Sequence, residues 1–225
     1  MLGSALIKDA YSLVRPYWLR VMAAVAMYIA AAVLTGFIAT FIAVLFFAKG
    51  DPGYNPAIRL LHAILFAGPS IWFLNLFARY IRNPEEGFSI LVWPGLRPLV
   101  NLAIFQFATQ LFAVLVAYIL SLLIALHPFI ILAVSVLVLI TIFWLVVRTA
   151  FVPILVLDED QALLGAVQRS WAATSGAFWI VIVSMLLLAV VTLAGLLALG
   201  LGFLFTYGLA VAGYVLLFDR LSTRS

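Results

Sequence analysis

The sequence contains no cysteine, and among its 225 residues only 12 are Lys or Arg and 8 are Asp or Glu. Without thiols there is no disulfide framework, no thiolate metal site and no cysteine nucleophile. Only two histidines occur, His62 and His127, and neither has a carboxylate or second histidine three or four residues away, the spacing typical of metal ligands. No phosphate-binding glycine loop or nucleophile elbow is present either. We therefore expect a chain that is not an enzyme and carries no metal or cofactor.

What fills the chain instead is apolar: 68% of the residues are hydrophobic and 14% are aromatic. Soluble domains contain about 45–50% apolar and about 25% charged residues. A chain of this size could not hide so much apolar surface from water, because a domain of ~200 residues leaves roughly a quarter to a third of its surface exposed. Lipid is therefore the expected solvent. The net charge of +4 comes from scattered basic residues, so we expect no nucleic-acid partner.

The apolar residues form long uninterrupted runs. A helix needs about 20 apolar residues to cross the hydrocarbon core of a bilayer, whereas a membrane barrel would show alternating segments of about ten residues. We predict an all-α polytopic transmembrane helix bundle of about six spans, with cytoplasmic interfacial amphipathic helices. The single membrane domain, 1–225, would have its spans at approximately 21–47, 60–78, 99–126, 129–148, 177–199 and 203–218.

The connections between spans are predicted from glycine and proline. The run 177–218 contains no charge and is about twice the length of one crossing. Gly200-Leu201-Gly202 allows a turn near its middle, so we predict two spans there, with a five-span protein as the alternative. Pro69 predicts a kink in the second span, and His127-Pro128 predicts a tight antiparallel hairpin between the third and fourth.

The basic residues predict the orientation of the spans. With the N-terminus inside, the cytoplasmic side carries ten basic residues and the opposite side only Lys49 and Arg59. Excess Lys and Arg mark the cytoplasmic side of membrane proteins. We predict a multi-pass protein of the inner membrane with both termini in the cytoplasm. The ten are Lys8, Arg15, Arg20, Arg79, Arg82, Arg97, Arg148, Arg169, Arg220 and Arg224.

Three segments are predicted to lie along the membrane surface rather than cross it: 4–17, 88–98 and 160–175. In the first, Leu6, Ala10, Leu13 and Tyr17 share one side of a helix, which is typical of an interfacial helix. The second is too apolar for a free loop and too interrupted by proline for a span. We expect Trp93 and Arg97 to anchor it at the headgroups.

The segment 160–175 follows an acidic turn in which Asp158 or Asp160 could cap a helix. The residues predicted on its apolar side are Leu163, Leu164, Val167, Trp171 and Thr174. Arg148, at the end of the preceding span, could pair with Asp158 or Asp160 or contact a lipid phosphate. A cytoplasmic interaction motif is therefore predicted from Arg148, Asp158, Asp160, Arg169 and Trp171.

This region also carries a resemblance. It combines an apolar stretch with Pro153, the acidic pair Asp158-Glu159, the run Arg169-Ser170-Trp171 and then Phe178-Trp179 before the next span. The pattern resembles the YciC-type bacterial inner-membrane proteins and the membrane domain of some glycerophosphodiester phosphodiesterases. The resemblance implies the fold and the location. It implies no activity, because those phosphodiesterases hold their chemistry in a separate soluble domain, which we do not expect in this chain.

The predicted spans contain four amide side chains, which are Asn75, Asn101, Gln106 and Gln110. The two glutamines share a helix face at i and i+4. Such amides usually join neighbouring helices by hydrogen bonds, and the alternative is a path for a solute. Whether His62 or His127 contacts a haem or pigment also stays open at this point.

Small residues four positions apart let helix backbones approach closely. They predict tight packing in the first, fifth and sixth spans. The pairs are Gly36 with Thr40, Ala194 with Ala198, and Gly208 with Ala212.

These features favour a non-catalytic accessory, scaffold or lipid- or protein-binding subunit of the membrane. The expected partners are membrane lipids and other membrane-protein subunits or further copies of the chain. A small solute carrier or channel that uses Gln106 and Gln110 is the alternative.

Overall fold

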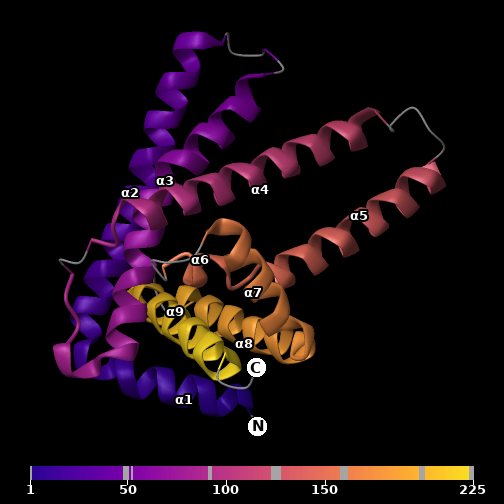
Figure 1. Cartoon of the computed structure of the whole chain (residues 1–225). Helices are drawn as coiled ribbons and strands as arrows, with labels where there is room; N and C mark the ends of the chain where they lie inside the picture. The colour runs from indigo at the N-terminus through magenta and orange to yellow at the C-terminus, as the bar shows by residue number, and fades with distance from the viewer. Residues whose placement is uncertain are drawn as a thin grey trace.

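The computed structural model describes residues 2–47, 51, 53–90, 93–122, 128–157, 162–197 and 201–222. Throughout these residues every regular element is a helix and none is a strand. Figure 1 shows the whole chain. The all-α fold predicted from the continuous apolar runs is confirmed.

Six stretches of the described residues are long and apolar enough to cross a membrane. The uncharged run 177–218 is divided between two of these helices, which supports six spans rather than five. The chain is therefore an integral, multi-pass membrane protein. The helices are α2 (Trp18–Phe46), α3 (Tyr54–Arg82), α4 (Leu96–Leu122), α5 (Pro128–Arg148), α8 (Phe178–Leu197) and α9 (Leu201–Ser222).

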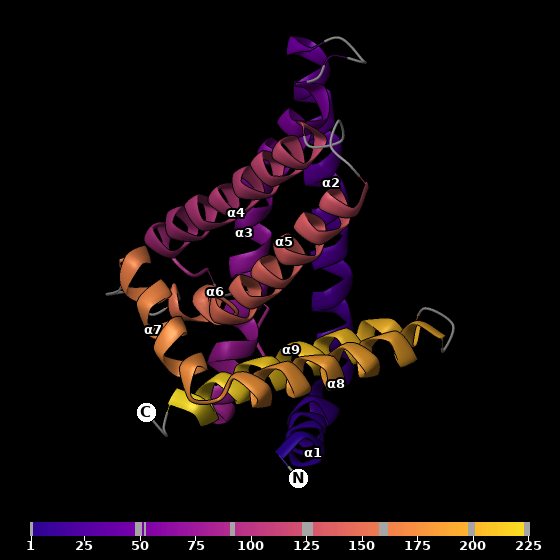
Figure 2. The same cartoon turned by 90° about the vertical axis from the view of Figure 1, so that its right-hand side faces the viewer.

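The long helices run in different directions. α2 and α3 form one upright pair, and the α8–α9 hairpin runs across the lower part of that pair (Figures 1 and 2). α9 packs against α1 (Leu2–Val14), α2 and α3. Gly208 permits this crossing, because a methyl group added there would clash with Val21 Cγ1 on α2. The close packing predicted at Gly208 and Ala212 is confirmed, since Ala212 is also buried.

The predicted surface helix 4–17 corresponds to α1 and the 3₁₀ turn Arg15–Tyr17. Its apolar side packs on protein, because Leu6 and Ala10 are buried and α1 contacts α9 and α8. Tyr17 stacks edge-on against Tyr80 with ring centroids 5.3 Å apart. The Tyr80 hydroxyl donates a hydrogen bond of 2.8 Å to the carbonyl of Leu13. α1 is thus attached to α3 and α9.

The described residues 83–90 and 93–95, here called the return segment, differ from the prediction of a surface segment over 88–98. After the 3₁₀ turn Pro84–Glu86, Phe88 is buried against the rings of Phe77 and Tyr80 at 5.4 and 5.5 Å. Trp93 lines a cavity of about 370 Å³ together with Pro69 and other α3 and α2 residues. The segment therefore runs back along α3 instead of lying at its end.

Hydrogen bonds from side chains hold the return segment in place. Trp72 Nε1 donates to the carbonyl of Ile90 at 3.2 Å, and Arg20 Nη1 donates to the carbonyl of Phe88 at 3.3 Å. Irregular backbone at membrane depth requires such internal partners. The sequence does not indicate that Trp72 and Arg20, which lie in other helices, supply them. As a result α4, with Arg97 in its first turn, starts beside the middle of α3, where Leu99 packs against Gly68.

α4 and α5 do not form the tight hairpin predicted from His127-Pro128. The two helices diverge from their connected ends (Figure 1), and an apolar cavity of about 390 Å³ lies between them. Phe105 and Phe112 line it from α4, and Leu145 and Val146 line it from α5. His127 lies outside the described residues.

The short helices α6 (Val152–Leu155) and α7 (Leu163–Ser175) follow α5. α6 is buried, whereas α7 buries a face of small residues that includes Ala166 and Ser170. Leu164, predicted on the apolar side of α7, is 76% exposed and therefore does not pack on the protein. The N-cap of α7 is Ala162, without a side-chain cap, and not an acidic residue. Asp158 and Asp160 lie outside the described residues.

Candidate functional site

The Arg148 cluster consists of Arg148, Trp144, Trp171 and Phe178, where α5, α7 and α8 meet. The guanidinium carbon lies 5.6, 5.4 and 5.7 Å from the centroids of the Trp144, Trp171 and Phe178 rings. The two indoles touch edge to face at 4.8 Å. A cation over an aromatic face is attracted by the ring quadrupole, with tryptophan giving the strongest interaction. Arg148 therefore connects the end of α5 to α7 and α8.

Hydrogen bonds add to this connection. Arg148 Nη1 donates to the carbonyl of Trp171 at 3.4 Å and to Thr174 Oγ1 at 3.5 Å. Arg148 Nε is buried without a hydrogen-bond partner in the part of the chain the structure describes. The predicted proximity of Arg148 and Trp171 is thus observed, while a pairing of Arg148 with Asp158 or Asp160 falls outside the described residues.

Ser170 is a structural residue of this region that the sequence reasoning missed. Its hydroxyl donates to the carbonyl of Arg148 at 2.7 Å and accepts from the backbone N–H of Phe151 at 3.2 Å. Ser170 and Phe151 have no exposed surface. The one signal in the sequence was the position of Ser170. It lies on the same helix face as Val167 and Thr174, at i+3 and i+4 spacing. This one hydroxyl satisfies the backbone where α5 ends.

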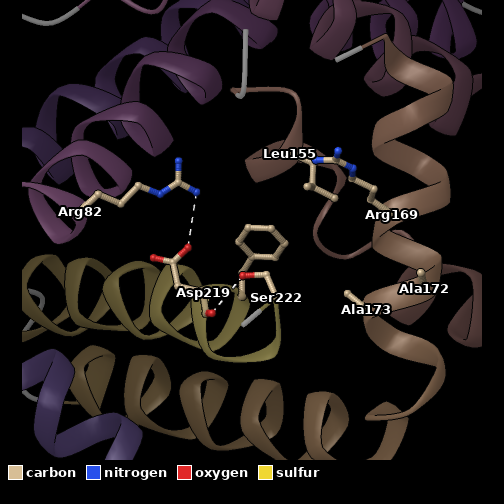
Figure 3. Close-up of a pocket in the computed structure, with 8 residues that line it drawn as sticks. Arg82, Leu155, Arg169, Ala172, Ala173, Asp219 and Ser222 are labelled. Atoms are coloured by element: carbon tan, nitrogen blue, oxygen red, sulfur yellow. Dashed lines mark hydrogen bonds and ion pairs between the residues drawn. The ribbon is translucent and has the colours of Figure 1, made fainter. Parts of the chain in front are cut away.

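The rim pocket lies on the other side of α7, with a volume of about 530 Å³ (Figure 3). Arg82 at the end of α3 and Arg169 on α7 extend toward it from opposite sides, with Asp219 and Ser222 of α9 between them. Arg82 Nη2 lies 3.4 Å from Asp219 Oδ1. The residues that line the rim pocket are Arg82, Leu155, Arg169, Ala172, Ala173, Phe218, Asp219 and Ser222. The structure therefore separates Arg169 from Arg148, which the sequence grouped together.

Ion pairs gather at the same end of the molecule. Arg220 pairs with Asp9 and links α9 to α1, and the Arg82–Asp219 pair links α3 to α9. Both pairs are partly exposed, and such pairs contribute about 0–1 kcal/mol each. They position α9 and α1 rather than stabilise the fold strongly.

A second polar pocket lies between α3 and α4, with a volume of about 270 Å³. Gln106 and Gln110 of α4 line it, as the shared face at i and i+4 predicts, but they meet Arg59 and His62 of α3, which the sequence did not connect with them. The residues that line this α3–α4 pocket are Arg59, His62, Ala63, Phe66, Gln106, Thr109 and Gln110. Gln106 Oε1 is buried and has no hydrogen-bond partner within the described ranges.

The two asparagines lie elsewhere. Asn75 is half-buried on α3 and its side chain makes no hydrogen bond in the described part of the chain, and Asn101 is half-buried on α4. His62 Nε2 lies 3.3 Å from the carbonyl of Ala32, and its ring stacks on Phe66 at 5.4 Å. The imidazole is therefore engaged with α2 and with its own helix.

The described residues contain no group of three or more His, Asp or Glu side chains that could hold a metal ion. The fold and these pockets define a helical integral membrane protein with polar cavities at both ends of α3. No protein-family model, curated protein or solved structure matches the chain. The resemblance carried by residues 153–179 stays a prediction.

Proposed function

We propose that this chain is a non-catalytic accessory protein of a bacterial inner membrane, of the YciC-like type, that binds anionic phospholipid through the rim pocket. Both termini and the rim pocket would face the cytoplasm. The observation that carries the proposal is the pair Arg82 and Arg169, which extend into one cavity from two helices. Interaction with further membrane proteins or further copies of the chain would use the exposed apolar faces of its spans.

The dimensions of α3 support a membrane boundary at Arg82. Arg59 and Arg82 are 23 residues apart on this one helix, which corresponds to about 35 Å at the rise of an α-helix. The hydrocarbon core of a bilayer is about 30 Å thick. The two arginines can therefore reach opposite headgroup layers, and the excess of basic residues predicted for the cytoplasmic side would place Arg82 on that side.

The chemistry of the rim pocket suits a phosphate. An arginine has five N–H donors in a planar fork, so Arg82 can keep Asp219 and still donate to a phosphate oxygen. Leu155 and Phe218 supply apolar walls beside the two arginines. This combination matches a lipid headgroup with the beginning of its acyl chains.

The double variant R82Q/R169Q tests the proposal. Purified wild-type protein should bind phosphatidylglycerol more tightly than phosphatidylcholine in native mass spectrometry. The double variant should lose about tenfold or more of that phosphatidylglycerol affinity, because each charge-assisted hydrogen bond contributes about 1.5–3 kcal/mol. The single variant R169Q leaves the Arg82–Asp219 pair intact and should lose part of the preference.

The matched control is K8Q/R15Q, which removes the same charge from exposed positions on α1 and the turn after it. This control should bind phosphatidylglycerol like the wild type. Equal losses in both double variants, or a wild-type protein without preference for the anionic lipid, would overturn the rim-pocket proposal.

The alternative function, a small solute carrier or channel, is favoured by one observation. Gln106, with its buried unpaired oxygen, and Gln110 form a polar pocket among otherwise apolar helices. Polar groups at membrane depth are candidates for substrate contacts. Binding of a free solute in this pocket would favour the carrier over the accessory function.

A further inference from the structure

The α3–α4 pocket differs from the rim pocket in its charge. Among the described residues that line it, Arg59 is the one charged residue and none is acidic. Within the described residues the Arg59 side chain forms no ion pair or hydrogen bond. A guanidinium group presents donors suited to a phosphate or carboxylate, so this pocket has a cation available for an anionic group.

The pocket also presents hydrogen-bond acceptors. Gln106 Oε1 is buried and unpaired, and leaving such an acceptor unsatisfied costs about 1–3 kcal/mol. His62 Nε2 lies 3.3 Å from the Ala32 carbonyl, which can only accept, so Nε2 donates this hydrogen bond. Gln106 Oε1 would be satisfied by a ligand that donates an N–H bond.

The position of the pocket relates it to the membrane surface. Arg59 lies in the second turn of α3, about 35 Å along the helix from Arg82. Arg59 therefore reaches the headgroup layer opposite to the rim pocket. The volume of about 270 Å³ is below the range of about 300–1,000 Å³ typical of drug-sized ligands, and it suits a headgroup rather than a whole lipid.

We propose that the α3–α4 pocket binds a phosphate–ammonium zwitterion, the phosphoethanolamine group, with the phosphate on Arg59 and the ammonium donating to Gln106 Oε1. The group can come from phosphatidylethanolamine of the facing leaflet or from free phosphoethanolamine. Both sources present an anion and an N–H donor a few bonds apart. This site is independent of the rim pocket and of its anionic lipid.

A comparison of two phospholipids tests the donor requirement. Phosphatidylcholine has the same phosphate, but its quaternary ammonium has no N–H to donate to Gln106. In native mass spectrometry the wild-type protein should bind phosphatidylethanolamine about tenfold more tightly than phosphatidylcholine, as expected for a charge-assisted hydrogen bond to a buried acceptor. Q106L should remove this difference.

Arg59 variants test the phosphate contact separately. R59Q should weaken both lipids by a similar factor, while R59K, which keeps the cation, should retain most of the wild-type affinity. T141V on α5 is the control, since Thr141 is exposed and its hydroxyl bonds only to Leu137 within its own helix. This variant should bind both lipids like the wild type.

Free phosphoethanolamine distinguishes the two sources. Competition by millimolar phosphoethanolamine against bound phosphatidylethanolamine would identify the headgroup alone as sufficient and a solute as the ligand. Lack of competition, with the lipid preference intact, would identify the lipid. Equal wild-type affinity for the two lipids together with no effect of Q106L would overturn the proposal, and it would leave the result for R82Q/R169Q untouched.

Discussion

Replacing Gly195 with leucine is expected to destabilise the α8–α9 hairpin. A methyl group at Gly195 would lie 2.7 Å from the carbonyl oxygen of Gly202 and the same distance from Thr206 Cβ. The carbonyl belongs to the backbone of α9 and cannot move aside as a flexible side chain would. Overpacking of this kind costs about 1–3 kcal/mol, so the melting temperature in detergent should fall by roughly 5–10 °C.

The neighbouring residue provides the control for this prediction. Ala194 is exposed, so Ala194→Leu adds a side chain of the same size to the outer face of α8. Its melting temperature should stay within the error of the wild-type value. Similar melting temperatures for Gly195→Leu and Ala194→Leu would show that α8 and α9 do not approach each other at Gly195.

Replacing Ser170 with alanine is the second substitution with a large expected effect. The change leaves the buried N–H of Phe151 without its acceptor and removes the hydrogen bond to the carbonyl of Arg148. An unsatisfied buried polar group costs about 1–3 kcal/mol. Thermal unfolding followed by tryptophan fluorescence should show this loss, and Trp171 lies next to the site.

Ser175 allows the same substitution to be made on the same helix as a control. Its hydroxyl is exposed and bonds to Ala172 one turn back within α7. Ser175→Ala should therefore leave the unfolding temperature nearly unchanged. If Ser170→Ala were as mild as Ser175→Ala, the serine would not hold the end of α5 as the geometry indicates.

Sequence alone predicted the helical class and the number of spans because both follow from local properties. Runs of about 20 apolar residues need a helix in lipid whatever their neighbours are. The division of the run 177–218 into α8 and α9 followed from the same length argument. Small residues marked close packing correctly at Gly208, but on α8 Gly195 is buried whereas the predicted Ala194 is exposed.

Contacts between distant residues could not be predicted in this way. Trp93 is exposed, as a surface anchor would be, but the sequence did not show that Trp72 on α3 donates a hydrogen bond to the return segment, which runs back along that helix. The sequence placed Leu164 on the apolar side of α7, but it did not show that α7 packs on the protein through its small residues, among which Ser170 bonds to backbone at the end of α5. Charge and polarity located Gln106 as a site residue, while the α3 residues that complete its pocket depend on the tertiary fold.

The central claim is that the end of the molecule with Arg82, Arg169 and both termini faces the cytoplasm, while Arg59 faces the other side. Since the chain has no cysteine, a single introduced thiol reports its own location. A membrane-impermeant maleimide should label Asn55→Cys, at the exposed start of α3, in intact cells, and it should label Ser12→Cys and Ser175→Cys only after the membrane is opened. Labelling of Ser12→Cys or Ser175→Cys in intact cells would contradict this orientation and the assignment of the rim pocket to the cytoplasmic leaflet.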